Sequence, residues 1–241
     1  MGISCVDMEL AVSEISRWIE SGQRKYVCLT GVHGVMEAQR CRELREVHNR
    51  AGLTLPDGMP MVWAARWAGA NWVSRVYGPD LMLSFLEVAA RRRWRVYLYG
   101  GREGLADRLA EALLQRFPGV QLAGTWTPPF GDLGNWVDHD AVESINRSHA
   151  DVVWVGLSTP KQERWMSRHR PLLEAPVLIG VGAAFDMLAG DLPQAPPWVR
   201  RSGLEWLFRL CQEPGRLWRR YLGNNPRFAL SILRRPPRLV R

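Results

Sequence analysis

Short apolar runs alternate with segments of helical periodicity along most of the chain. The runs are rich in β-branched and aromatic residues, which is typical of buried strands, and the segments between them repeat apolar positions every three or four residues. We therefore expect strands at 26–30, 95–99, 120–126, 151–155 and 177–181, with helices near 35–50, 105–117 and 136–148 and another opened by Pro160. Such alternation predicts an α/β fold in which helices flank a mainly parallel, Rossmann-like sheet.

Ligands of such folds bind beyond the carboxyl ends of the strands, so the loops there hold the candidate residues. The loop after the strand at 95–99 begins with Gly100 and Gly101 and opens a helix. Its backbone N–H groups can contact a phosphate or a sugar, although a tight turn without a ligand has the same sequence. The G-x-G-x-x-G spacing and the following acid of a dinucleotide site are missing, which argues against a nicotinamide cofactor.

Asp57 follows a short apolar strand in a loop stiffened by Pro56 and opened by Gly58. A carboxylate held in this way above a sheet can serve as a general base. The same position also suits a residue that caps the helix beginning near Pro60.

Gln162 lies in the first turn of the helix opened by Pro160, directly after an apolar strand. Its amide can donate to and accept from sugar hydroxyls or a diphosphate, and the helix N-terminus favours an anion. A solvated first-turn residue is the alternative. His33 lies just past the strand that ends at Thr30, where it can reach a substrate.

The positive charge of the chain is concentrated at its end. Residues 200–241 hold eleven arginines, no lysine and only two acids, whereas the rest of the chain is close to neutral. Large apolar residues alternate with the arginines, and prolines at 214, 226 and 236–237 interrupt the pattern, which predicts two or three short amphipathic helices. An acidic lipid surface or a phosphorylated substrate fits this segment. A nucleic-acid arm would leave its apolar side chains in water, and a solvated basic surface is the remaining alternative.

Other sequence features bear on the cellular compartment of the protein and on its domain organisation. No apolar run is long enough to cross a bilayer, acids stand where a signal peptide carries positive charge, and the four cysteines have no close partners. We expect a cytoplasmic protein with a core at 1–197 and a basic helical appendage at 198–241. Asp138 and Asp140 form a D-x-D triplet, but at the start of a polar helix they favour the helix dipole over a metal.

Several motifs, taken together, resemble the WecG/TagA/CpsF family of bacterial glycosyltransferases. They are P-D-G at Asp57, G-G at Gly100, V-G-L-S-T-P-K-Q-E around Gln162, G-V-G-A-A-F-D ending at Asp186, A-P-P-W at Ala195, and G-L-E-W-L-F-R-L with E-P-x-R-L-x-R-R after Gly203. The resemblance implies an inverting transferase of the GT-E fold type that moves a sugar from a UDP-sugar onto a polyprenyl-diphosphate-linked saccharide. It also implies envelope polysaccharide synthesis at the inner face of the membrane. Because fixed arginines can neutralise a leaving diphosphate, we expect no metal cofactor.

The resemblance also assigns roles to single positions. Asp57 takes the place of the catalytic base, Thr30 that of a threonine near the sugar, and Gln162 that of a glutamine in the cleft. By the resemblance, Arg209, Arg216 and Arg219 reach the nucleotide diphosphate from the appendage, and the motif positions Gly100, Gly101 and Asp186 complete the substrate-binding set in the core. His33 joins this set only through its place close to Thr30 at the end of a strand.

The sequence departs from the family pattern at two places, both of which concern the choice of sugar. Gly31-Val32-His33 stands where many members have an asparagine, and Gln194 stands where many have arginine. The donor can be UDP-N-acetylmannosamine, its uronic acid, UDP-glucose or UDP-glucuronate. A non-catalytic membrane adaptor and a nucleic-acid-binding protein with the same core are the alternative functions, and self-association is compatible with the resemblance.

Overall fold

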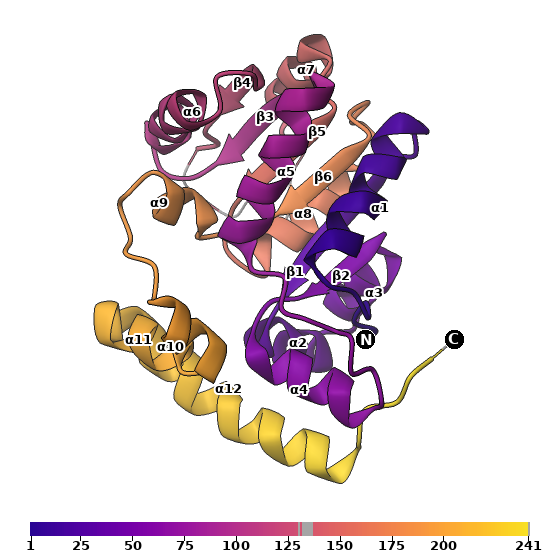
Figure 1. Ribbon diagram of the computed structural model, residues 1–241, viewed down its shortest axis with the longest axis vertical. Helices are drawn as coiled ribbons and strands as arrows, with labels where there is room; N and C mark the ends of the chain where they lie inside the picture. Colours follow the sequence, from indigo (N-terminus) through magenta and orange to yellow (C-terminus); the bar gives the residue numbers. More distant parts are fainter. Residues whose placement is uncertain (130, 132–136, 241) are drawn as a thin grey trace.

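Six parallel strands form the centre of the molecule (Figure 1). The computed structural model describes residues 1–129, 131 and 137–240. The strands are β1 (Lys25–Thr30), β2 (Leu53–Pro56), β3 (Arg95–Gly100), β4 (Gln121–Trp126), β5 (Val152–Gly156) and β6 (Val177–Gly180), in the spatial order β2-β1-β6-β5-β3-β4. The predicted α/β fold with a parallel sheet is therefore confirmed.

Helices cover both faces of the sheet because alternate strand residues point to opposite sides. One face carries α1 (Met8–Glu20), α5 (Gly78–Arg92), α6 (Leu105–Arg116) and α9 (Ala184–Leu188), and the other carries α3 (Arg42–Arg50), α7 (His139–Ser148) and α8 (Lys161–His169). Val27 and Leu29 of β1 enter the first core, whereas Tyr26 and Cys28 enter the second. The expected helix at 136–148 begins at His139 in the structure, and residue 136 lies outside the described residues.

The helix expected at 35–50 is two helices, α2 (Val32–Arg40) and α3. Cys41 separates them with extended backbone angles, φ −119° and ψ 112°. The prediction of one helix was wrong because packing decides this boundary: α2 contacts the C-terminal helices, whereas α3 turns away to contact α8.

The basic segment forms α10 (Pro197–Ser202), α11 (Glu205–Gln212) and α12 (Pro214–Arg234). α12 lies along α2, and α10 contacts α4 (Met59–Trp67), so the segment crosses the lower edge of the molecule in Figure 1. The predicted break at Pro214 is confirmed, but the one at Pro226 is wrong, because α12 continues through this proline. Within the described ranges, no helix is long and apolar enough to span a membrane.

Candidate active site

A cavity of about 720 Å³ opens between the carboxyl edge of the sheet and the basic helices. Loops that follow β1, β2, β5 and β6 form its core side, and α11 and α12 form its other side. Of the predicted site residues, the structure brings five to this cavity: His33, Asp57, Gln162, Arg209 and Arg216.

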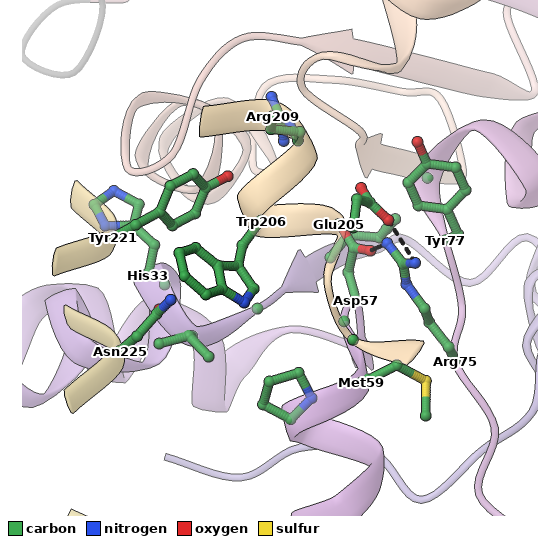
Figure 2. Close-up of a pocket in the computed structure, with 18 of the residues that line it drawn as sticks. His33, Asp57, Met59, Arg75, Tyr77, Glu205, Trp206, Arg209, Tyr221 and Asn225 are labelled. Carbon is green, nitrogen blue, oxygen red and sulfur yellow. Dashed lines mark hydrogen bonds and ion pairs between the residues drawn. The ribbon is translucent and has the colours of Figure 1, made fainter. Parts of the chain in front are cut away.

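Asp57 is held at the end of β2 by a backbone hydrogen bond from its own N–H to the carbonyl of Thr30 (3.0 Å). Its side chain does not cap α4, whose N-cap is Gly58, so the capping alternative is wrong. Instead Asp57 Oδ1 accepts a hydrogen bond from Arg75 Nη2 (3.2 Å). The carboxylate therefore faces the cavity with one fixed cationic partner (Figure 2).

Arg75 joins Asp57 to the basic helices. Its Nη1 lies 2.6 Å from Glu205 of α11, and both side chains of this pair are nearly buried. Burial by itself would lower the pKa of Arg75, but the two carboxylates outweigh burial and raise it. Tyr77 lies under the guanidinium, with 4.3 Å from Arg75 Cζ to the ring centroid, and burial followed by Glu205 and Asp57 raises the pKa of its hydroxyl. The position of α11 and the orientation of Asp57 are thus linked through one side chain.

Four arginines line the cavity from the C-terminal helices: Arg200 on α10, Arg209 on α11, and Arg216 and Arg220 on α12. Arg219 does not line it, because its side chain lies over Trp218 on the exposed surface, 5.2 Å from the ring centroid. Burial lowers the pKa of Arg220, as expected for a cation removed from water. Guanidinium groups match phosphate oxygens in charge and shape, so this wall of the cavity suits a diphosphate.

Gln162 is 3% exposed, so the solvated alternative for this residue is wrong. Its Nε2 donates to Glu163 Oε1 (3.2 Å), which also accepts from the hydroxyl of Thr159 (2.9 Å). Gln162 Oε1 is buried without a hydrogen-bond partner among the described residues, and Gln162 is one of the residues that line the cavity. Glu163 is fully buried, and burial raises its pKa. Buried acceptors are normally paired, so Gln162 offers an open position to a ligand donor.

His33 lies in the first turn of α2 and lines the same cavity. Asn224 of α12 donates from Nδ2 to His33 Nδ1 (3.0 Å). Burial, and next the charge of Arg220, lowers the pKa of His33 to about 4, so the ring is neutral at physiological pH. Thr30 is buried behind the cavity wall, with its hydroxyl 3.4 Å from His48 Nδ1.

Three further predicted residues are not among those that line the cavity: Gly100, Gly101 and Asp186. Gly100 has φ +119°, and a Cβ there would meet the backbone of Gly156 at 2.8 Å, so the loop is a tight turn. Asp186 on α9 pairs with Arg102 (3.3 Å), and burial raises its pKa.

The D-x-D triplet occupies the start of α7, as its sequence predicts. Asp138 caps the helix by accepting from the backbone N–H of Ala141 (3.0 Å), and its other oxygen accepts from the hydroxyl of Tyr99 (3.2 Å). Among the described residues, no three His, Cys, Asp or Glu side chains are grouped as metal ligands.

The sequence analysis missed several lining residues: Arg75, Tyr77, Glu205, Trp206, Arg220 and Tyr221. Glu205 and Trp206 belong to the G-L-E-W motif and Arg220 follows Arg219, so a signal for these existed. Arg75 stands alone in a loop, and no local pattern marks it.

Comparisons with known proteins show what this chain is similar to. The model of the Glycosyl transferase WecG/TagA/CpsF family matches residues 1–240. A relative from Bacillus subtilis (strain 168) is 32% identical over 194 residues, 80% of this chain and 73% of its own length. Another from Bacillus spizizenii (strain ATCC 23059 / NRRL B-14472 / W23) is 29% identical over 232 residues, 95% of this chain and 88% of its own length. Both are named N-acetylglucosaminyldiphosphoundecaprenol N-acetyl-beta-D-mannosaminyltransferase.

Proposed function

The chain belongs to the WecG/TagA/CpsF family of glycosyl transferases, and on this premise we propose that it moves a sugar from a UDP-sugar onto a polyprenyl-diphosphate-linked saccharide. One observation carries the proposal: a single cavity combines the carboxylate of Asp57 with the guanidinium groups of Arg209, Arg216 and Arg220. A glycosyl transfer needs a group that takes a proton and groups that receive a diphosphate, and these residues supply both.

Asp57 is the proposed general base. An acceptor hydroxyl attacks the anomeric carbon of the donor, its proton passes to Asp57, and the bond to the nucleotide breaks on the opposite face with inversion. Arg75 holds Asp57 by a hydrogen bond of 3.2 Å and fixes the direction of the carboxylate. A carboxylate in this role contributes roughly 10²–10⁴-fold to the rate.

The leaving UDP carries away the electron pair of the broken bond, and charge develops on its bridging oxygen. Arg209, Arg216 and Arg220 are the proposed counter-charges, which makes a metal-independent reaction our expectation. Gln162 Oε1, which lacks a partner among the described residues, is proposed to accept from a donor-sugar hydroxyl or amide. Two relatives are named as N-acetylmannosaminyltransferases, so UDP-N-acetylmannosamine is the first donor to test.

The proposed setting is polysaccharide synthesis of the bacterial envelope, at the inner face of the membrane. The lipid-linked acceptor supports this setting, because the relatives' names include an undecaprenol diphosphate. The arginines exposed at the end of α12 are proposed to contact anionic lipid.

The test measures UDP release by the purified chain with a panel of UDP-sugars and a short-chain polyprenyl-diphosphate N-acetylglucosamine acceptor. We expect acceptor-dependent release that survives EDTA and falls by at least about 10²-fold in Asp57→Asn. Asp140→Asn, a matched change in the first turn of α7 outside the cavity, should keep wild-type activity. No transfer with any donor would overturn the proposed function, and loss with EDTA would overturn the metal-independent mechanism.

A further inference from the structure

The cavity continues from the polar site into an apolar groove. Beyond Asp57 the lining residues come from α4 and from the second half of α12. On the α4 side they are Trp63, Ala64 and Trp67, and on the α12 side they are Phe228, Ala229, Ile232 and Leu233. We define these seven residues as the apolar groove.

The α4 wall carries two large aromatic side chains that are only half covered by the rest of the described structure. Trp63 and Trp67 stand one helical turn apart and are 50% and 55% exposed. Two indoles on one helix face would each bury a large apolar area if a ligand covered them. Trp63 is fixed in position because Gly203 leaves just enough room for it; a Cβ on Gly203 would meet the Trp63 ring at 2.5 Å.

The α12 wall is buried at Phe228 and exposed at Leu233. Phe228 is buried and Ile232 packs beside it in a small cluster with Met36 of α2 and Met61 of α4. Leu233, one position further, is 69% exposed. The groove therefore has a fixed floor and an open, apolar upper side.

We propose that the groove holds the first isoprenoid units of the lipid-linked acceptor while the acceptor sugar lies at Asp57. This inference rests on the proposed function and assigns it a second subsite. Continuity is the first reason: an acceptor that has a sugar, a diphosphate and a hydrocarbon chain in series matches a cavity that is polar at one end and apolar at the other.

The surroundings of the open end give the second reason. Arg234 directly follows Leu233, and Arg235 and Arg238 come next in the exposed C-terminal segment. Leu239 of this segment lies near Gly69, just after the end of α4, since a Cβ added at Gly69 would be in van der Waals contact with it. Arginines beside exposed tryptophans are the composition of a membrane-interface contact, so a chain leaving the groove here would enter a bilayer.

A direct binding experiment tests the groove without depending on turnover. The full chain is irradiated with a benzophenone-bearing farnesyl diphosphate, and the labelled peptides are identified by mass spectrometry. We expect label on α4 or on residues 228–233 of α12, competed by unmodified farnesyl diphosphate. Label confined to other exposed apolar residues, such as Trp198 or Leu222, would overturn the proposal. Labelling that falls as the protein concentration rises would show that a second copy occupies the groove instead.

A second experiment compares the acceptor kinetics of two matched variants. Ala229→Trp fills the groove, whereas Leu230→Trp puts the same indole on the neighbouring residue, which does not line the cavity. We expect Ala229→Trp to raise the KM for a long-chain acceptor about tenfold or more, with no change for an acceptor whose prenyl chain is replaced by a methyl group. Leu230→Trp should match wild type. Trp67→Ala, an exposed site whose truncation costs little stability, should weaken farnesyl diphosphate binding several-fold.

Together, the labelling and the kinetics distinguish failure of the groove proposal from failure of the proposed function. Equal effects of Ala229→Trp on long-chain and methyl acceptors would overturn the groove and leave the transferase intact. Farnesyl labelling in the groove together with no transfer to any acceptor would support the groove and overturn the proposed reaction.

Discussion

At the scale of single residues, the turn after β3 depends on a glycine. Gly100 has φ +119° and approaches the backbone of Gly156 too closely for a side chain. Gly100→Ala should lower the free energy of unfolding by roughly 3 kcal/mol or more, because strain and a backbone clash act together. Gly223→Ala, in the interior of α12 with open space around it, should instead stabilise by up to about 1 kcal/mol. Urea denaturation of both variants checks the pair, and a tolerated alanine at 100 would contradict the structure.

His48 is a second residue with a measurable consequence. It is 2% exposed, and burial lowers its pKa to about 4 from the usual value near 6.5. Below pH 6.5 the unfolded chain takes up a proton that the folded chain does not, so stability is lost as the pH falls from 6.5 toward 4. In His48→Gln the difference in unfolding free energy between pH 7 and pH 5 should shrink by about 2 kcal/mol. An unchanged difference would mean that His48 is protonated in the folded protein.

At the scale of secondary-structure elements, α12 stays helical despite the proline in its interior. Pro226 removes one backbone hydrogen bond and crowds the carbonyl of Leu222, yet the helix continues to Arg234. Pro226 is exposed, whereas Asn224 and Phe228 are buried against the core, so tertiary packing compensates for the proline. Local propensity predicts the opposite outcome, which is why the break at 226 was wrongly expected.

That compensation can be measured. Pro226→Ala should raise the free energy of unfolding by roughly 1 to 3 kcal/mol, because alanine restores the hydrogen bond and favours the helix. Pro236→Ala, beyond the end of α12, should change it by less than about 0.5 kcal/mol. Equal effects of the two changes in thermal denaturation would show that α12 is broken at 226 in solution.

The link between α11 and the core is an ion pair with little solvent around it. Glu205→Gln leaves Arg75 with Asp57 as its remaining carboxylate partner, so we expect a loss of roughly 2 to 3 kcal/mol and faster hydrogen exchange in α10–α12. Glu14→Gln, which breaks an exposed pair with Arg17, should cost less than about 1 kcal/mol. Unchanged hydrogen exchange in α10–α12 would mean that the ion pair of Arg75 and Glu205 does not hold these helices on the core.

At the scale of the whole molecule, sequence periodicity predicts the local elements but not the contacts between distant segments. Each strand and most helices follow from periodicity within one window, and the loops beyond the strand ends locate Asp57 and Gln162. Contacts between distant segments leave no such pattern. The pair of Arg75 and Glu205, and the choice of Arg220 over Arg219 for the cavity, depend on how α11 and α12 lie on the core.

The charge distribution belongs to the same scale. α5 and α6 end at the amino edge of the sheet, just before β3 and β4, whereas the basic helices lie at the carboxyl edge (Figure 1). Attraction to an anionic membrane should therefore depend on where a charge is removed. Each arginine near an anionic surface contributes about 1 kcal/mol, so replacing Arg234 and Arg235 by serine should weaken binding to phosphatidylglycerol vesicles by roughly 30-fold.

A matched double variant separates position from net charge. Arg91→Ser with Arg116→Ser removes the same charge at the opposite edge, where both side chains are exposed. It should leave vesicle binding within about twofold, because a surface field falls off within a Debye length of roughly 8 Å at physiological ionic strength. Vesicle sedimentation at low and high salt distinguishes the two cases. Equal loss from both variants would mean that total charge governs binding, and the acceptor would then have to enter the groove without a fixed orientation at the bilayer.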